Sequence, residues 1–395
     1  MRAINLKTEY LADPLGIDIV NPRFFWQCPE GFEQKAYQII AKKDNAIIWN
    51  SSKVISSETS HIPYEGPSLN SRDRIEWSIK LWNQDDQESE VSFSFFEMGL
   101  LDKMDWVGKW ISGNYEPKKN KRYPIDSFRK TFELTKKPIK ARLYITALGI
   151  YKASLNNNFI TDFELAPGST DYNKRLHYQT YDITPYLEKD NTFELSLGDG
   201  WYRGSLGAYG QTHVYGRKTK LLCQIEIYFE DGSKKIIGSD DSFSWSNDGP
   251  VRFNDLKDGE IYDSNKNPSY KGYASLSSEN RNLIASNNVF PKKQEILEAK
   301  LITSPKGKLL LDFGQNIAGF LSFKLKGPKG KKVKFRLGEI LDNQGEFTQN
   351  NFQLIKPVNE WGPLKAFILM IGIGKKLKNT QFTPKQEITF ICSIE

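Results

Sequence analysis

The stretch Arg74-Ile-Glu-Trp-Ser-Ile-Lys-Leu-Trp82 alternates polar and apolar side chains almost throughout its length. A period of two places one set of side chains in a core and the other in water, as in a half-buried β-strand. Moving outward along the chain, the same kind of pattern recurs in further segments: Lys35–Ala41, Val91–Phe96, Ala141–Thr146, Leu222–Phe229, Leu309–Phe313 and Lys331–Leu337. Only Asp182–Leu187 suggests a turn of helix. We therefore expect an all-β protein built from tandem antiparallel β-sandwiches.

Turns and shifts in composition divide the chain into domains. Turn signals such as Asp231-Gly232 and Pro305-Lys-Gly307 separate the strand segments. We predict an immunoglobulin- or fibronectin-like sandwich over 1–98, a connector over 99–125 and a larger sandwich with a linker over 126–298. A further β-sandwich is expected to start over 299–352. An atypical tail follows over 353–395, where the strand alternation stops.

Composition narrows the classes of function. The 395 residues carry 55 Lys+Arg and 48 Asp+Glu, a net charge of +7, which is a modest excess for a nucleic-acid binder of this size. The longest apolar runs are too short to span a membrane. Residues 1–19 include Asp13 and Asp18 and lack the apolar core of a signal peptide, so we expect a cytoplasmic protein. Three cysteines and three histidines at wide spacing do not form a disulfide framework or a zinc motif.

The densest group of chemically useful side chains lies in Gly198-Asp-Gly-Trp-Tyr-Arg-Gly204. Sugar recognition needs an aromatic face against C–H groups beside polar groups that match hydroxyls. Asp199, Trp201, Tyr202 and Arg203 supply these groups between glycines, which makes them candidate carbohydrate-binding residues. A structural interpretation stays open, in which Trp201 and Tyr202 fill a core and Asp199 closes a turn.

Metal and hydrolytic chemistry are less well supported. The acidic stretch Asp240–Asp263 is compatible with calcium, but its spacing does not fit an EF-hand loop, and the sequence requires no cofactor. Glycoside hydrolysis needs two carboxylates across a cleft, which spacing along a sequence does not establish. The Gly-x-Ser-x-Gly, P-loop and His-Glu-x-x-His motifs are absent from the sequence. We assign no catalytic residue.

An ordered set of motifs over about residues 14–350 resembles the N-terminal β-domains of bacterial α-L-rhamnosidases of glycoside hydrolase family 78. The motifs are Pro14-Leu-Gly-Ile-Asp18, Asn21-Pro-Arg-Phe-Phe-Trp26, Asp105-Trp-Val-Gly-Lys-Trp-Ile111, Leu165-Ala-Pro-Gly-Ser-Thr-Asp-Tyr-Asn-Lys-Arg175, Tyr178-Gln-Thr-Tyr-Asp-Ile-Thr184, Leu197-Gly-Asp-Gly-Trp-Tyr-Arg-Gly204, Gly259-Glu-Ile-Tyr-Asp263 and Leu311-Asp-Phe-Gly-Gln-Asn-Ile-Ala-Gly319. The resemblance implies that the second sandwich is jelly-roll-like. In that family an (α/α)6 barrel further along the chain carries the catalytic acid and base, and nothing in this sequence resembles it.

The resemblance implies three functional interpretations. The complete family enzyme would hydrolyse terminal α-L-rhamnosyl residues by inversion, and this chain would be inactive without the barrel. Alternatively, the chain is a module that binds L-rhamnose-containing glycans, with calcium in some relatives, or a structural module that pairs with a separately encoded catalytic chain. Asp171 is the first candidate sugar ligand, followed by Asp199 and Trp201. The resemblance fades near Phe352, so we hypothesise that the atypical tail arises from a frameshift or premature stop.

Overall fold

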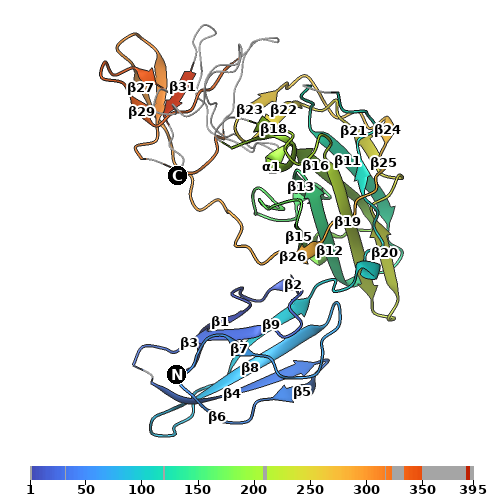
Figure 1. Cartoon of the computed structure of the whole chain (residues 1–395), viewed down its shortest axis with the longest axis vertical. Helices are drawn as coiled ribbons and strands as arrows, with labels where there is room; N and C mark the ends of the chain where they lie inside the picture. The colour runs from blue at the N-terminus through green and yellow to red at the C-terminus, as the bar shows by residue number, and fades with distance from the viewer. Residues whose placement is uncertain are drawn as a thin grey trace.

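The computed structural model describes residues 2–31, 33–118, 121–207, 211–315, 317–322, 333–348 and 388–391. Within these residues the chain is almost entirely β-structure, arranged as two β-sandwiches followed by a smaller β-segment (Figure 1). The prediction of an all-β fold with tandem antiparallel sandwiches is confirmed. Among the described residues, no helix is long and apolar enough to cross a membrane.

The first sandwich consists of two sheets. One has the strand order β1-β3-β7, and the other has the order β2-β9-β8-β4-β5 with β6 paired to β4. All pairs are antiparallel except β2 with β9. The strands are β1 (Ile4–Thr8), β2 (Leu15–Ile17), β3 (Arg23–Gln27), β4 (Gln34–Lys43), β5 (Ala46–Asn50), β6 (Val54–Ile55), β7 (Ile62–Pro63), β8 (Arg74–Asn83) and β9 (Ser92–Met98).

The alternation in β8 produces the core of this sandwich. Ile75, Trp77 and Ile79 point inward and are buried, while the residues between them face outward. Trp77 packs against Phe24 of the facing sheet, with ring centroids 4.6 Å apart. Burial of large aromatic and aliphatic side chains supplies most of the stabilisation of such a sandwich.

The second sandwich is larger. Its seven-stranded sheet has the order β25-β10-β19-β12-β15-β26 with β20 paired to β19, and its six-stranded sheet has the order β14-β13-β16-β11-β21-β24. The strands are β10 (Ile111–Ser112), β11 (Asp126–Glu133), β12 (Pro138–Leu148), β13 (Ile150–Leu155), β14 (Asn158–Phe159), β15 (Leu176–Asp182), β16 (Asp190–Gly198), β19 (Lys220–Phe229), β20 (Lys234–Gly238), β21 (Ser244–Ser246), β24 (Gly272–Tyr273), β25 (Ser275–Leu276) and β26 (Leu283–Ala285).

Strands β12 and β19 are buried on both faces over most of their length. One face contributes Leu143 and Ile225 to the core between the two sheets. The other face is covered by the connector, where Trp110 packs against Leu148 and Leu222. Both halves of the alternation in Leu222–Phe229 are therefore buried: Ile225 and Ile227 face the core between the sheets, and the polar Gln224 and Glu226 on the other face are covered as well.

Segments predicted as connector and linker contribute edge strands to the second sandwich. β10 lies within 99–125, and β24, β25 and β26 lie within the final, linker-like part of 126–298. The connector also forms η1 (Lys103–Asp105), and the turn expected over Asp182–Leu187 is η2 (Thr184–Tyr186). One end of the sandwich bears α1 (Gly200–Arg203) and two hairpins, β17 (Ser205–Leu206) with β18 (Gln211–Thr212), and β22 (Val251–Asp255) with β23 (Gly259–Tyr262).

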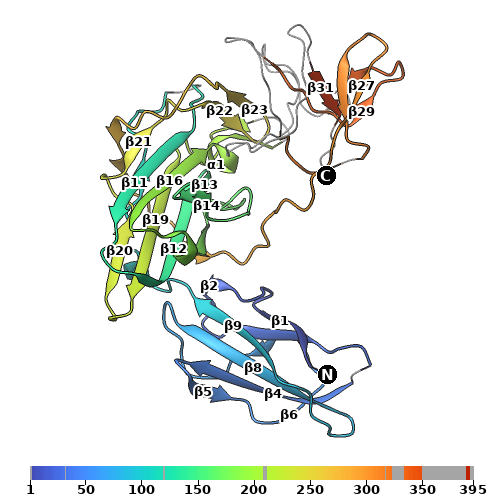
Figure 2. The ribbon, with the colours of Figure 1, turned by 180° about the vertical axis from the view of Figure 1, so that it is seen from behind.

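After β26 an extended segment leads to the third β-segment (Figure 2). This segment contains β27 (Lys300–Thr303), β28 (Leu309–Asp312), β29 (Ile340–Leu341), β30 (Phe347–Thr348) and β31 (Ile388–Ile391). The prediction of a strand over Lys331–Leu337 is wrong for the part that the structure describes, because residues 333–337 are irregular. Alternation selects the buried side chain, here Leu337, but a strand also needs a pairing partner. The predicted tail, 353–395, lies outside the described residues except for β31.

Candidate functional site

The glycine-rich loop that follows β16 forms a single turn of helix, α1, at one end of the second sandwich. Gly200 has a φ of +54°, and a Cβ atom there would lie 2.4 Å from Cγ1 of Ile150. A Cβ atom on Gly204 would lie 2.4 Å from the carbonyl oxygen of Gly200. Both glycines are therefore needed for the chain to turn this tightly against β13.

The turn buries an ion pair between Asp199 and Arg203. Each residue is only 1% exposed, and Nη2 of Arg203 lies 2.6 Å from Oδ1 of Asp199. Nη1 of Arg203 donates a hydrogen bond to the hydroxyl oxygen of Tyr115 at 2.6 Å. Because the guanidinium and the carboxylate are buried and pair with each other, neither group presents a free surface to a ligand in this structure.

A second arginine extends this network to the β22–β23 hairpin. Arg122 forms ion pairs with Asp255 and with Asp258, the latter at 3.1 Å, and its Nε lies 3.7 Å from Oδ2 of Asp199. Asp255 also accepts hydrogen bonds from backbone N–H groups, including that of Ser205 at 2.7 Å. The hairpin is thus tied to α1 through charged groups.

Asp126, at the start of β11, also belongs to this network. Its Oδ1 accepts a hydrogen bond from Nε1 of Trp245 at 2.9 Å. Its Oδ2 accepts hydrogen bonds from the hydroxyls of Thr219 and Tyr115. We name the six charged residues of this region the sandwich-end network: Arg122, Asp126, Asp199, Arg203, Asp255 and Asp258.

Burial governs the electrostatics of the sandwich-end network. Burial raises the pKa of Asp199, although the neighbouring Arg203 and Arg122 oppose the change. Burial likewise raises the pKa of Asp255 against the opposing effect of Arg122. A carboxyl group whose pKa is raised in a cleft is a feature of general acids, but these two face arginines inside the protein. The arrangement is typical of structural ion pairs.

The aromatic residues of the loop differ in exposure. Tyr202 is buried and packs against Tyr172, which in turn contacts Tyr215, with ring centroids 5.3 and 5.0 Å apart. Trp201 is half-buried at the edge of the same cluster, which also contains Trp110. Part of the Trp201 side chain is therefore accessible, whereas Tyr202 belongs to the interior.

Asp171 lies on the surface beside this aromatic cluster. Its side chain is 45% exposed, and its Oδ1 accepts a hydrogen bond from the backbone N–H of Asn173 at 3.1 Å. The next residue, Tyr172, is buried against Tyr202. Of the five predicted site residues, Asp171 and Trp201 thus offer accessible surface, while Asp199, Tyr202 and Arg203 are buried. Binding of a carbohydrate by any of them stays a prediction.

The described residues contain no group of three or more His, Cys, Asp or Glu side chains arranged to hold a metal ion. In the acidic stretch considered for calcium, basic side chains supply positive charge. Asp248 pairs with Lys266 and Arg252, and Asp255 pairs with Arg122. Calcium binding stays a prediction.

Sequence reasoning missed Arg122 and Asp126, two of the six residues of the sandwich-end network. Arg122 lies in a basic loop whose composition suggests only a solvated segment, and Asp126 begins an ordinary strand. The sequence did contain one signal for such pairing, the cluster of aspartates after residue 240, whose arginine partners lie in other segments. Pairing across such separations depends on topology, so the local sequence does not reveal it.

The fold and this network define a class of protein: a tandem of antiparallel β-sandwiches whose buried charges stabilise the domains. Comparisons with known proteins narrow this class to particular protein families. Residues 3–102 match the family model of the Rha78A-like N-terminal immunoglobulin domain, and residues 136–305 match the alpha-L-rhamnosidase N-terminal domain. Residues 302–362 match the bacterial alpha-L-rhamnosidase concanavalin-like domain, so this match extends past Phe352.

Two curated alpha-L-rhamnosidases are similar to the chain over most of its length. The one from Formosa agariphila is 34% identical over 378 residues, covering 88% of this chain and 40% of that protein. The one from an Alteromonas species is 29% identical and covers 90% of this chain and 42% of that protein. The chain thus spans about two fifths of the length of these relatives.

Solved structures agree with this similarity. The α-L-rhamnosidase of Aspergillus terreus superposes with a TM-score of 0.81 at 30% identity, over 88% of this chain and 42% of that one. The α-L-rhamnosidase of Streptomyces avermitilis, at 23% identity and a TM-score of 0.80, shares the fold. Successive segments of the chain thus match three domain models of the α-L-rhamnosidases. The catalytic domain of that family is absent from these 395 residues.

Proposed function

We propose that the chain forms the non-catalytic, N-terminal part of an enzyme that releases terminal α-L-rhamnosyl residues from glycans or glycosides. The observation that carries this proposal is the ordered match of three rhamnosidase domain models along one chain, over 3–102, 136–305 and 302–362. The role of these domains is to form a β-scaffold beside the catalytic domain.

The proposal includes the absence of turnover by these 395 residues alone. Glycoside hydrolysis uses two carboxyl groups that face each other across a bound sugar, about 5–10 Å apart. In the described part of the chain, the buried carboxylates Asp199, Asp255 and Glu226 are engaged by arginines. Groups neutralised in this way are not free to protonate a leaving oxygen or to activate water.

An assay with an aryl α-L-rhamnoside tests this proposal. We expect no release of the aryl group above the rate in buffer, whereas a complete α-L-rhamnosidase serves as the positive control. Turnover that follows the protein through purification would contradict the proposal. The variants Asp199→Asn and Asp255→Asn would then show whether the sandwich-end network supplies the activity.

A second candidate function is the binding of L-rhamnose-containing glycans by the second sandwich. It is favoured by one observation: the half-buried Trp201 packs against the cluster that contains Tyr172, the residue that follows the exposed Asp171. An indole face and a carboxylate suit the C–H groups and hydroxyls of a sugar. Under this function, millimolar L-rhamnose would bind the wild-type chain, and Trp201→Ala would lose the binding.

Calorimetry with L-rhamnose, with and without calcium, tests the second candidate. Trp49→Phe, a change within the core of the first sandwich, is the matched control because it alters a tryptophan far from the aromatic cluster. If the wild-type chain gives no heat of binding at millimolar L-rhamnose, this function is ruled out. Co-purification with a separately encoded catalytic chain would instead support a structural role with a protein partner.

A further inference from the structure

Two buried glutamates at the boundary between the first two sandwiches each pair with an arginine from the other domain. Glu97, at the end of β9 in the first sandwich, is fully buried. Arg142 of β12 in the second sandwich holds it with two contacts, from Nε at 2.8 Å and from Nη2 at 3.0 Å. Lys140 adds a third contact at 3.0 Å.

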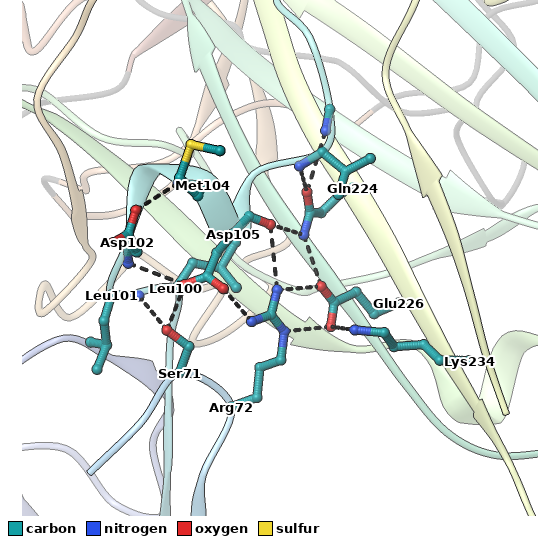
Figure 3. A network of polar contacts seen from close by, with 12 residues as sticks. Ser71, Arg72, Leu100, Leu101, Asp102, Met104, Asp105, Gln224, Glu226 and Lys234 are labelled. Carbon is teal, nitrogen blue, oxygen red and sulfur yellow. Dashed lines mark hydrogen bonds and ion pairs between the residues drawn. The ribbon is translucent and has the colours of Figure 1, made fainter. Parts of the chain in front are cut away.

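The reverse pairing lies nearby. Glu226 of β19, in the second sandwich, is also fully buried and accepts hydrogen bonds from Nε and Nη2 of Arg72, both at 2.7 Å (Figure 3). Arg72 belongs to the loop that precedes β8 and also contacts Asp105 of the connector at 2.6 Å. We name the pairs Arg142–Glu97 and Arg72–Glu226 the interdomain ion pairs.

Each of these glutamates also has an arginine directly opposite it within its own sheet. The register of β8 and β9 places Arg74 opposite Glu97, and the register of β12 and β19 places Arg142 opposite Glu226. Arg74 rests on the ring of Phe95, with its guanidinium carbon 3.7 Å from the ring centroid. Directly opposite residues on one sheet face have Cβ atoms about 5 Å apart, within reach of an ion pair.

Other contacts also cross the boundary, and several of them are polar. The backbone N–H of Leu100 donates to the hydroxyl oxygen of Tyr178 at 2.9 Å. The backbone N–H of Ala285 donates to Oδ2 of Asp18 at 2.7 Å. The apolar part is a small cluster that contains Leu100 and Tyr178. Domain boundaries of this kind favour relative motion unless they are large and hydrophobic.

We propose that the first two sandwiches form a hinged pair that is held closed by the interdomain ion pairs and opens by exchange of arginines. On opening, Glu97 pairs with Arg74, and Glu226 pairs with Arg142. Each sandwich then retains a neutralised carboxylate and stays folded while the boundary separates. Without such exchange, opening would separate Glu97 from both Arg142 and Lys140 and would leave Glu226 with Lys234 of β20 at 4.0 Å. The loss of these arginines is costly wherever water does not fully replace them.

Hydrogen–deuterium exchange of the whole chain tests this proposal, read at the backbone amides of Leu100 and Ala285, which donate across the boundary. The double variant Glu97→Gln/Glu226→Gln removes both charges with little change in shape. Hydrogen bonds to charged groups are stronger than those between neutral groups, so we expect exchange at both amides to rise by about tenfold or more. Amides in β8 and β16 should keep the wild-type rate. Glu194→Gln, which alters the pair of Glu194 with Arg129 within one sheet, is the matched control.

The variant Arg74→Met distinguishes opening with a change of arginine partners from ion pairs that only hold the boundary together. Arg74 lies outside the interdomain ion pairs, so its loss removes a partner that Glu97 needs mainly when the boundary is open. Exchange at Leu100 and Ala285 should therefore slow by several-fold relative to wild type. Unchanged or faster exchange in Arg74→Met would overturn the proposal. The proposal would also fail if the double variant left the exchange rates of both amides unchanged. It would fail as well if amides in β8 and β16 exchanged as fast as those at the boundary, because the sandwiches would then be unfolding together with it.

Discussion

The guanidinium of Arg203 lies 2.6 Å from the carboxylate of Asp199, four residues earlier in the chain, and both groups are buried at the end of the second sandwich. The pair closes one turn of helix between two glycines. Residues chosen from the sequence as sugar ligands thus serve first to hold the loop in place.

The first prediction concerns the stability of this loop. Asp199→Asn keeps the shape of the side chain but leaves Arg203 without its nearest negative partner, so we expect a loss of about 3 kcal/mol in the free energy of unfolding. Asp171→Asn, a change on the surface, should alter it by less than about 0.5 kcal/mol. Urea unfolding followed by tryptophan fluorescence measures both values. Equal stabilities for the two variants would contradict a structural role for Asp199.

The second prediction concerns Gly200. Gly200→Ala places a methyl group 2.4 Å from a side-chain atom of Ile150 at a φ of +54°. Overpacking adds about 1–3 kcal/mol to the cost of the left-handed conformation. Gly232→Ala is the control, because Gly232 has a φ of +77° with nothing within 4 Å of its Cβ position. Thermal unfolding should show the larger loss for Gly200→Ala, and a larger loss at Gly232 would contradict the packing argument.

The third prediction concerns the effect of low pH on the boundary between the first two sandwiches. Burial opposes ionisation of Glu226, but hydrogen bonds from Arg72 and Tyr228 outweigh it and lower its pKa below the ordinary value of 4.5. A lowered pKa means that the contribution of this carboxylate is fully present above the ordinary value and is lost as the pH falls through the lowered one. Charged and titratable groups surround Glu226 from both sandwiches: Arg72, Asp105, Arg142, Tyr144, Tyr228 and Lys234.

We therefore expect the boundary between the sandwiches to be stable at neutral pH and to loosen progressively as the pH falls from about 4.5 through the lowered pKa of Glu226. Exchange at the amide of Leu100, corrected for the pH dependence of the intrinsic rate, measures this change. Glu226→Gln should flatten the profile, because it removes the group that titrates. A profile that stays equally steep in this variant would assign the acid response to other carboxylates.

The fourth prediction concerns thiol reactivity. Burial raises the pKa of Cys223 to about 12, while Cys28 is only half-buried, with a pKa that burial also raises. The thiolate is the reactive form, so at pH 8 iodoacetamide should modify Cys28 faster than Cys223 in the folded chain. Both should react at similar rates in urea. Mass spectrometry of the peptides distinguishes the sites, and faster modification of Cys223 would contradict its placement in the core.

Strand alternation was enough to predict the sandwiches, because side-chain periodicity is a local property. In β8 the inward positions Ile75, Trp77 and Ile79 are those that the pattern selects. The pattern failed over 333–337, where alternation is present but the backbone is irregular. It also missed that β25 and β26, in a segment with the composition of a linker, form the two edges of a sheet.

By itself, the sequence determined the class of fold and the resemblance to the N-terminal domains of α-L-rhamnosidases, because apolar periodicity and short motifs are carried by neighbouring residues. Only the tertiary structure decided which charges meet. Arg72 reaches Glu226, and Arg142 reaches Glu97, across long separations in the chain. Such pairs form because a buried charge needs a partner of opposite sign, and the packing of two sheets selects which partner is near.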